Sequence, residues 1–331
     1  MGRLSLAEVD AAREARGRSV LLFITDRCPV GCAHCSVDSR ADSPSITDFE
    51  LFGQIVDAIC ARPEVRVVGI SGGEPFVERR GLTLAAHKMV EAGKDLVLYT
   101  SGVWAKSNSA PAWIRDVVGI ASCVFLSTDA FHAEQIADEQ FIRAARTISG
   151  EGVPIVVQVL DNGVMIERAR ELLLAAFGAS WAEHAEINLI PPLPYGRGAT
   201  VFMRGAGRSG RDYGRCRVAA APVIRYDGRM SGCCNESVIM GGGPGVLRRT
   251  CGSRAEADAA IEHFATDPFL GAIGGVGAGE LTGHPRFRDL GGEKFTSICD
   301  LCWKMLERTA ADERPDPMIV ALDLVGQARD E

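Results

Sequence analysis

The sequence predicts an α/β fold: a partial (β/α)6, TIM-like barrel followed by a small C-terminal subdomain of a β-hairpin and a helix. Two observations predict it. Short apolar runs alternate with helical patterns six times over roughly 175 residues, which is typical of parallel strands joined by right-handed crossovers. Six units are too few to close an eight-unit barrel, so we expect an open one, with its active face at the carboxyl ends of the strands.

Five segments follow from this division. We expect a helical extension at 1–18, the barrel at 19–194, a linker rich in Gly and Arg at 195–215, the C-terminal subdomain at 216–305 and a tail at 306–331. The run Pro191-Pro192-Leu193-Pro194 breaks the alternation and marks the end of the barrel.

The barrel strands are the short runs rich in β-branched and apolar residues that end in polar or turn residues. They are expected at 19–25, 65–71, 94–102, 123–127, 153–160 and 185–190. Apolar residues at helical spacing predict helices between them, at 49–60, 84–92, 138–149 and 165–177.

Composition narrows the class of protein. The chain has 331 residues, 47% of them hydrophobic, and a net charge of −7, which argues against nucleic acid as the main partner. No apolar run approaches the length of about 18 residues that a membrane helix needs, and no secretory signal opens the chain. We therefore expect a soluble cytoplasmic protein without a membrane segment, and we assign seven of its 11 cysteines to metal sites.

Three of these cysteines follow the first strand. Cys28, Cys32 and Cys35 have the spacing C-x3-C-x2-C on a loop at the active end of the barrel. Three soft ligands suit an iron–sulfur cluster and leave one iron free for another ligand. A zinc site completed by His34 or Asp38 is the alternative.

This loop resembles the signature of the radical S-adenosylmethionine (SAM) superfamily, with His34 at the position where that family usually has an aromatic residue. The resemblance implies that the three thiolates hold a 4Fe–4S cluster. It also implies that SAM binds the open iron and is cleaved reductively to a 5′-deoxyadenosyl radical.

Further motifs stand at the ends of later strands. Gly72-Gly73-Glu74-Pro75 follows the second strand and resembles the family motif that binds the amino group of SAM. Glycines permit close approach of the backbone, and a carboxylate can accept hydrogen bonds from an ammonium group. Ser127 and Asp129 follow the fourth strand and resemble the Ser-x-Asp that reaches the SAM ribose and carboxylate, although Asp129 could instead cap a helix.

Three single residues are weaker candidates on the same face. Gln158 on the fifth strand and Asn188 on the sixth could contact the ribose or adenine of SAM. His132 could contact substrate, or it could be a surface or capping histidine.

The C-terminal segment carries a second cysteine pattern. Cys216 and Cys233 flank a hairpin expected around Asp227-Gly228, and Cys299 and Cys302 form a C-x2-C pair. Four thiolates could hold zinc or an iron–sulfur cluster. The arrangement resembles the twitch subdomain, a shortened SPASM domain, and so implies one auxiliary 4Fe–4S cluster; Cys234 could replace Cys233 as a ligand.

Four other features complete the chain. Cys60 and Cys123 are expected to pack in the core. Cys251 lies in an irregular stretch that no packing pattern explains. The glycine-rich run 271–279 lacks the strand and helix of a nucleotide loop, so we expect a flexible loop there. The arginines of 195–217 are either solvated or form an anion site.

The radical SAM resemblance implies abstraction of a hydrogen atom from an unactivated C–H bond, with a flavodoxin- or ferredoxin-type protein as reductant. If the auxiliary cluster accepts the second electron, the product is oxidised. If a cysteine thiol returns a hydrogen atom, the product is an epimer, and Cys251, then Cys234, are the candidate donors.

Two substrate classes fit this chemistry. Only about 18 residues precede the first strand, so a leader-binding domain is not expected in cis. This favours a sugar or aminocyclitol of a natural product, and the alternative is a ribosomally made peptide. A non-catalytic zinc-binding protein is a hypothesis of a different class.

Overall fold

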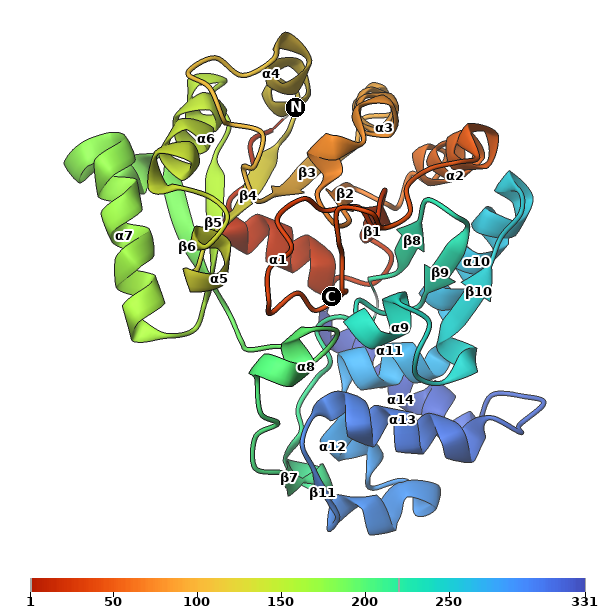
Figure 1. Ribbon diagram of the computed structural model, residues 1–331. Helices are drawn as coiled ribbons and strands as arrows, with labels where there is room; N and C mark the ends of the chain where they lie inside the picture. Colours follow the sequence, from red (N-terminus) through yellow and green to blue (C-terminus); the bar gives the residue numbers. More distant parts are fainter. Residues whose placement is uncertain (1, 220, 331) are drawn as a thin grey trace.

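The computed structural model describes residues 2–219 and 221–330, and it confirms the predicted α/β class. Six parallel strands pair in sequence order and form an open, partial barrel (Figure 1). They are β1 (Ser19–Phe23), β2 (Val67–Ser71), β3 (Asp95–Thr100), β4 (Cys123–Ser127), β5 (Ile155–Leu160) and β6 (Ala185–Ile190). Every strand end lies within two residues of its predicted position.

Helices cover the outer side of this sheet (Figure 1). They are α2 (Phe49–Cys60), α3 (Arg79–Glu91), α4 (Ala112–Gly119), α6 (Asp138–Gly150) and α7 (Gly163–Phe177), whereas the single turn α5 (Ala130–Ala133) follows the carboxyl end of β4. Outward-facing strand residues such as Val68, Leu98 and Val124 are fully buried in the core that these helices share. This burial on both faces explains why the strand runs are almost continuously apolar.

The helix predicted near the N-terminus lies inside the barrel. Helix α1 (Leu6–Glu14) begins at Ser5, which forms a capping box with Glu8. Its Val9 packs in a core cluster with Val97, Phe125 and other residues that point inward from the strands. Helix α1 therefore forms the floor of the barrel, and Figure 1 shows it on the inner side of the sheet.

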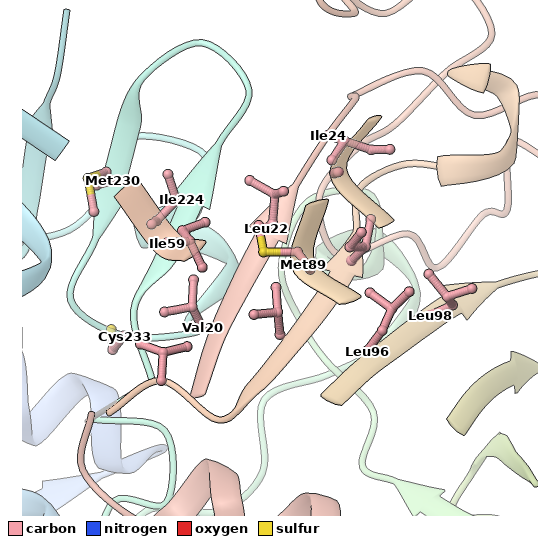
Figure 2. Close-up of a cluster of buried hydrophobic side chains, with 14 of the residues drawn as sticks. Val20, Leu22, Ile24, Ile59, Met89, Leu96, Leu98, Ile224, Met230 and Cys233 are labelled. Carbon is pink, nitrogen blue, oxygen red and sulfur yellow. The ribbon is translucent and has the colours of Figure 1, made fainter. Parts of the chain in front are cut away.

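The hairpin expected around Asp227-Gly228 extends the barrel sheet. Its first strand, β8 (Val223–Arg225), pairs in parallel with β1, and β9 (Arg229–Ser231) and β10 (Arg248–Thr250) follow antiparallel. The result is one sheet of nine strands. Figure 2 shows hairpin residues Ile224 and Met230 in the same apolar cluster as Leu22 of β1. The barrel and the C-terminal segment thus share one hydrophobic core.

The rest of the C-terminal half is mostly helical. It contains α8 (Gly198–Val201), β7 (Arg208–Ser209), α9 (Glu236–Ile239), α10 (Arg254–Thr266), α11 (Pro268–Gly275), α12 (Ala278–Leu281), β11 (Lys294–Phe295), α13 (Ile298–Thr309) and α14 (Pro317–Asp330). Short 3₁₀ turns lie at Pro75–Val77, Gly178–Glu183, Gly210–Asp212, Gly245–Leu247 and Pro285–Gly291. Within the described ranges, no helix is both long and apolar enough to cross a membrane.

The expectation of a flexible loop at 271–279 is wrong. Most of this run lies in α11 and α12, and Ala272 and Ile273 are fully buried. Gly275 packs directly on Gly326 of α14, where a Cβ on Gly275 would lie 2.6 Å from the Gly326 Cα. The glycines thus allow two helices to approach closely, a requirement that depends on a distant segment.

A buried ion pair joins the hairpin to the start of the first cysteine loop. The Arg225 side chain is 1% exposed, and its Nη2 lies 2.8 and 2.6 Å from the two carboxylate oxygens of Asp26. The hydroxyl of Tyr226 donates to the same carboxylate at 3.0 Å, and the Phe23 ring lies under the guanidinium. Removal of one partner would leave a buried charge unpaired.

We therefore predict that Arg225→Met lowers the free energy of unfolding by about 3 kcal/mol or more. The matched control is Arg229→Met on the same hairpin, because Arg229 pairs with Asp227 at the surface and should change stability by less than about 1 kcal/mol. Urea unfolding of both variants at equal iron content measures the difference. Equal stability of the two variants would contradict the prediction.

Candidate active site

A cavity of about 420 Å³ opens at the carboxyl ends of the barrel strands. Cys28, Cys32 and Cys35 line it, together with side chains from all six strands and from α1. The structure therefore brings the predicted cysteine loop and the predicted strand-end motifs to one place.

The spacing of the loop thiols bears on which metal group they suit. A zinc ion with bonds of about 2.3 Å holds its sulfur ligands about 3.8 Å apart. Among the described residues, no three cysteine Sγ atoms lie within 4.8 Å of one another. Burial raises the pKa of the Cys28 thiol to about 12, so its thiolate form needs a nearby positive charge. The donor set therefore fits an iron–sulfur cluster better than a single zinc ion.

Gly72 and Gly73 allow the backbone at the end of β2 to contact the start of the cysteine loop. Gly73 N–H donates to the Thr25 carbonyl at 2.7 Å, and Glu74 N–H donates to the Arg27 carbonyl at 2.9 Å. A Cβ would lie 2.5 Å from the Thr25 oxygen at Gly72 and 2.4 Å from the Arg27 oxygen at Gly73. Gly72 also has φ +153°. Only glycine fits both positions, and both residues line the cavity.

Glu74 has a different surrounding from the one expected. Its carboxylate is 1% exposed and accepts hydrogen bonds from Ser101 N–H (2.8 Å), Ser101 Oγ (2.5 Å), Thr100 Oγ1 (2.9 Å) and Phe76 N–H (3.3 Å). Pro75 is also buried, at the start of a 3₁₀ turn. The Glu74 carboxylate, which we expected to accept hydrogen bonds from an ammonium group of SAM, therefore accepts them from the protein itself. These bonds connect the ends of β2 and β3.

Three predicted polar residues form a row on neighbouring strands. Ser127 on β4 pairs in register with Gln158 on β5, which pairs with Asn188 on β6. Residues in register on parallel strands share a face of the sheet, and all three line the cavity. The row offers hydroxyl and amide groups for hydrogen bonds to a polar ligand.

Asp129 lies between two histidines. It caps α5, as the alternative reading of this residue predicted, and its oxygens lie 3.1 Å from His34 Nε2 and 3.0 Å from His132 Nδ1. Burial raises the pKa of the Asp129 carboxyl, but the two histidines outweigh burial and hold it well below its usual range. Burial lowers the pKa of His132, but the nearby Asp129 carboxylate, 3.0 Å from its Nδ1, and the Cys32 thiol prevail and raise it to about 10.

The four C-terminal cysteines come together beside the barrel. Cys302 interacts electrostatically with Cys216, Cys233 and Cys299, and burial raises the pKa of every one of the four thiols. Cys299 and Cys302 lie on the first two turns of α13, which begins after the capping residue Ser297. The side-chain amide of Asn235 donates to Cys299 Sγ at 3.3 Å.

Cys233 and Cys234 are adjacent but have different neighbours. Cys233 lies near the other three thiols of this group, Cys216, Cys299 and Cys302. Cys234 lines the barrel cavity, packs against Phe23 and Val223, and lies near the Arg13 side chain of α1. The structure thus favours Cys233 as the fourth member of the C-terminal group.

Cys251, the first candidate hydrogen donor, does not line the cavity. It is 2% exposed, and its Sγ lies 3.2 Å from Met230 Sδ and 3.4 Å from the Glu256 carbonyl. It therefore packs in the core below the hairpin. Cys60 contacts Met89 between two outer helices, and Cys123 is fully buried, so both have the packing role that was predicted.

Residues 22–173 match the family described as the Radical SAM superfamily. This region is a radical SAM domain. A domain of this family implies one 4Fe–4S cluster and SAM, and the three loop thiols and the polar row fit both.

Several known proteins share this radical SAM domain. The PqqA peptide cyclase of Granulibacter bethesdensis is 27% identical over 177 residues, which cover 51% of this chain and 47% of the relative. A GTP 3′,8-cyclase of Heliobacterium modesticaldum is 34% identical over 85 residues, 24% of this chain and 25% of the relative. The chain thus matches less than half of the length of these curated relatives.

One solved structure extends the likeness beyond the domain. Native anSMEcpe with bound AdoMet and Cp18Cys peptide superposes with a TM-score of 0.52 at 13% identity, covering 92% of this chain and 98% of anSMEcpe. At this identity the likeness shows the fold, and it includes most of the C-terminal half.

Sequence reasoning missed Arg197, which clamps the cysteine loop of the radical SAM domain. Its Nε and Nη2 donate to the Cys32 carbonyl at 3.0 and 2.8 Å, and its Nη1 contacts Asp38 at 2.7 Å. The flanking Gly196 and Gly198 lie against backbone carbonyls of the same loop. The start of segment 195–215 is therefore neither a solvated linker nor an anion site, and only the Gly-Arg-Gly pattern hinted at this contact.

We predict that Arg197→Met releases iron from the radical SAM cluster several-fold faster than the wild type, because the loop loses four hydrogen bonds. Arg204→Met is the matched control in the same segment, since Arg204 is exposed and its Nη1 lies 3.4 Å from Asp300 Oδ1, its one ion pair among the described residues. Iron transfer to a chelator measures the rate. Equal rates for the two variants would show that Arg197 does not hold the loop.

Proposed function

We propose that this radical SAM enzyme is an epimerase in which Cys234 returns a hydrogen atom to the substrate carbon. One observation carries the proposal: the Cys234 thiol lies on the wall of the cavity that Cys28, Cys32 and Cys35 also line. Among the described cysteines, these are the four that line it, so Cys234 is the thiol left over once the loop ligands are assigned.

We assign a different role to the residues on each side of the cavity. In this proposal Cys28, Cys32 and Cys35 hold the cluster. The Gly72-Gly73 backbone faces the amino group of SAM, and Ser127, Gln158 and Asn188 bind its ribose and adenine. When bound, the cluster and SAM supply the 5′-deoxyadenosyl radical that removes the hydrogen atom. Cys234 packs on β1 and β8, whereas the polar row lies on β4 to β6, so a substrate between them would meet the thiol from the other side.

The thiol step balances in atoms and electrons. The Cys234 S–H bond breaks homolytically, its hydrogen atom forms the new C–H bond, and a thiyl radical remains. A flavodoxin- or ferredoxin-type protein then supplies one electron and solvent supplies one proton, which restores the thiol. Epimerisation requires no further electron acceptor.

For the substrate we propose a peptide, in place of the sugar or aminocyclitol that the sequence favoured. Two of the known proteins support a peptide: the curated relative is named a PqqA peptide cyclase, and the solved structure of anSMEcpe contains a bound peptide. The GTP cyclase matches a shorter stretch of this chain.

We also propose that Cys216, Cys233, Cys299 and Cys302 hold one auxiliary 4Fe–4S cluster. Their mutual proximity, their burial and the absence of a zinc-like spacing among the described thiols support this assignment. Asn235 would then donate a hydrogen bond to one of the ligand sulfurs.

Iron content tests the two clusters. Anaerobically reconstituted wild type should hold about eight irons per chain, and Cys302→Ala should hold about four and still release 5′-deoxyadenosine from SAM. Cys28→Ala should also hold about four irons but cleave no SAM. About four irons in the wild type would contradict the auxiliary cluster.

Deuterium uptake tests the donor. With SAM and dithionite in D2O, a panel of synthetic peptides should yield a product heavier by one deuterium on carbon, because the thiol exchanges with solvent. Cys234→Ala should still cleave SAM but lose this uptake to background. Cys251→Ala is the matched control and should keep it, since its thiol lies in the core. Deuterium uptake that survives in Cys234→Ala would contradict Cys234 as the donor. Uptake that occurs with aminocyclitols in the same assay, and with none of the peptides, would contradict the peptide as substrate.

A further inference from the structure

Two histidines and one carboxylate converge on the wall of the cavity. His34, Asp129 and His132 each offer one ligand atom, and these three atoms all lie within 4.8 Å of one another. All three residues line the cavity. Among the described residues, no other three histidine, cysteine or carboxylate side chains have so compact a spacing.

Two separate loops supply this group, and each holds its side chains in place. His34 belongs to the first cysteine loop, and its ring stacks on Phe131 at 4.6 Å between centroids. Asp129 caps α5, which contains His132. Asp129 Oδ1 accepts hydrogen bonds from the backbone N–H groups of Phe131 and His132, at 2.9 and 3.0 Å. The protein therefore fixes the carboxylate and the stacked ring without help from a ligand.

The distances between the ligand atoms suit a divalent metal ion. Asp129 Oδ2 lies 3.1 Å from His34 Nε2, and Asp129 Oδ1 lies 3.0 Å from His132 Nδ1. The ligands of a tetrahedral zinc ion with bonds of about 2.0 Å are roughly 3.3 Å apart. Imidazole nitrogen and carboxylate oxygen both bind zinc, and a set of three protein ligands leaves the fourth position open.

Hydrogen bonds within the group do not fully account for this arrangement. His132 Nδ1 is buried and makes no aligned hydrogen bond, although Asp129 Oδ1 lies 3.0 Å away. The side chains of His34 and His132 are 15% and 16% exposed, and that of Asp129 is 5% exposed. A buried polar atom without a partner costs free energy. A metal ion between the three side chains would remove this cost.

We propose that His34, Asp129 and His132 form a metal site that binds one zinc ion, separate from the iron–sulfur clusters. Because the three residues line the cavity, a carbonyl or carboxylate oxygen of a ligand in the cavity could supply the fourth bond. This role replaces the contact with SAM that the sequence suggested for Asp129 and the contact with substrate that it suggested for His132. The inference goes beyond the proposed function and depends on neither Cys234 nor the peptide.

X-ray absorption at the zinc K-edge tests the ligands. The anaerobically reconstituted protein receives one equivalent of Zn²⁺ and passes through gel filtration, after which we expect about one zinc per chain. Its first shell should contain nitrogen and oxygen atoms at about 2.0–2.1 Å and no sulfur at about 2.3 Å. A sulfur shell would assign the zinc to cysteines and overturn the proposal. Failure of the iron-loaded protein to retain zinc would overturn it as well.

Competition with a zinc chelator tests the individual side chains. At full iron content, Asp129→Asn and His132→Phe should each weaken zinc binding about tenfold or more. Asn still caps a helix and Phe keeps a ring, so both changes preserve shape. His87→Phe is the matched control and should bind zinc like the wild type, because His87 pairs with Asp116 at 2.9 Å and belongs to no such group of three among the described residues. Equal zinc affinity in Asp129→Asn and the wild type would contradict the site.

A third variant keeps the test decisive if one of these two loses iron. His34→Phe keeps the stacking on Phe131, removes one ligand and should weaken zinc binding to the same degree. Unchanged zinc affinity in His34→Phe would overturn the proposal. Zinc binding is measured without substrate or turnover, so a failure of the deuterium assay would contradict the proposed function and leave this result unaffected.

Discussion

The active end of this protein depends on one backbone contact, between Gly72-Gly73 and the segment Thr25–Arg27. Two hydrogen bonds of 2.7 and 2.9 Å join the segments, and a side chain at either glycine would overlap a carbonyl oxygen. Glu74 carries the connection to Ser101 at the end of β3. Because Cys28 follows Arg27 directly, this contact fixes where the cysteine loop leaves the barrel. Arg197, which follows β6, donates two further hydrogen bonds to this loop at the Cys32 carbonyl.

The pairing of β8 with β1 connects the two groups of cysteines. It brings a hairpin more than 200 residues away into the barrel sheet, and the buried pair of Arg225 and Asp26 secures it beside the cysteine loop. The chain then passes Cys233 and Cys234 in succession. One thiol faces the C-terminal group and the other faces the cavity. The pairing of β8 with β1 therefore places the Cys234 thiol on the wall of the cavity in the radical SAM domain.

The floor and the mouth of the cavity differ in chemistry. Below, α1 fills the barrel with apolar residues and presents Arg13 to Cys234. Above, the row of Ser127, Gln158 and Asn188 and the pair of His34 and Asp129 supply polar groups beside the cysteine loop. The lining of the cavity therefore changes from apolar at the floor to polar beside the cysteine loop.

The sequence by itself determined the six strands, the cysteine loop and the polar row, because these depend on local patterns. Alternating strands and helices force parallel neighbours, and residues at equivalent strand ends then meet at one edge. Only the tertiary structure decided between Cys234 and Cys251, placed α1 inside the barrel and turned Gly271–Gly279 into packed helices. Each of these depends on partners 50 or more residues away, such as Phe23 for Cys234 and Gly326 for Gly275. Spacing along the chain carries no information about such contacts.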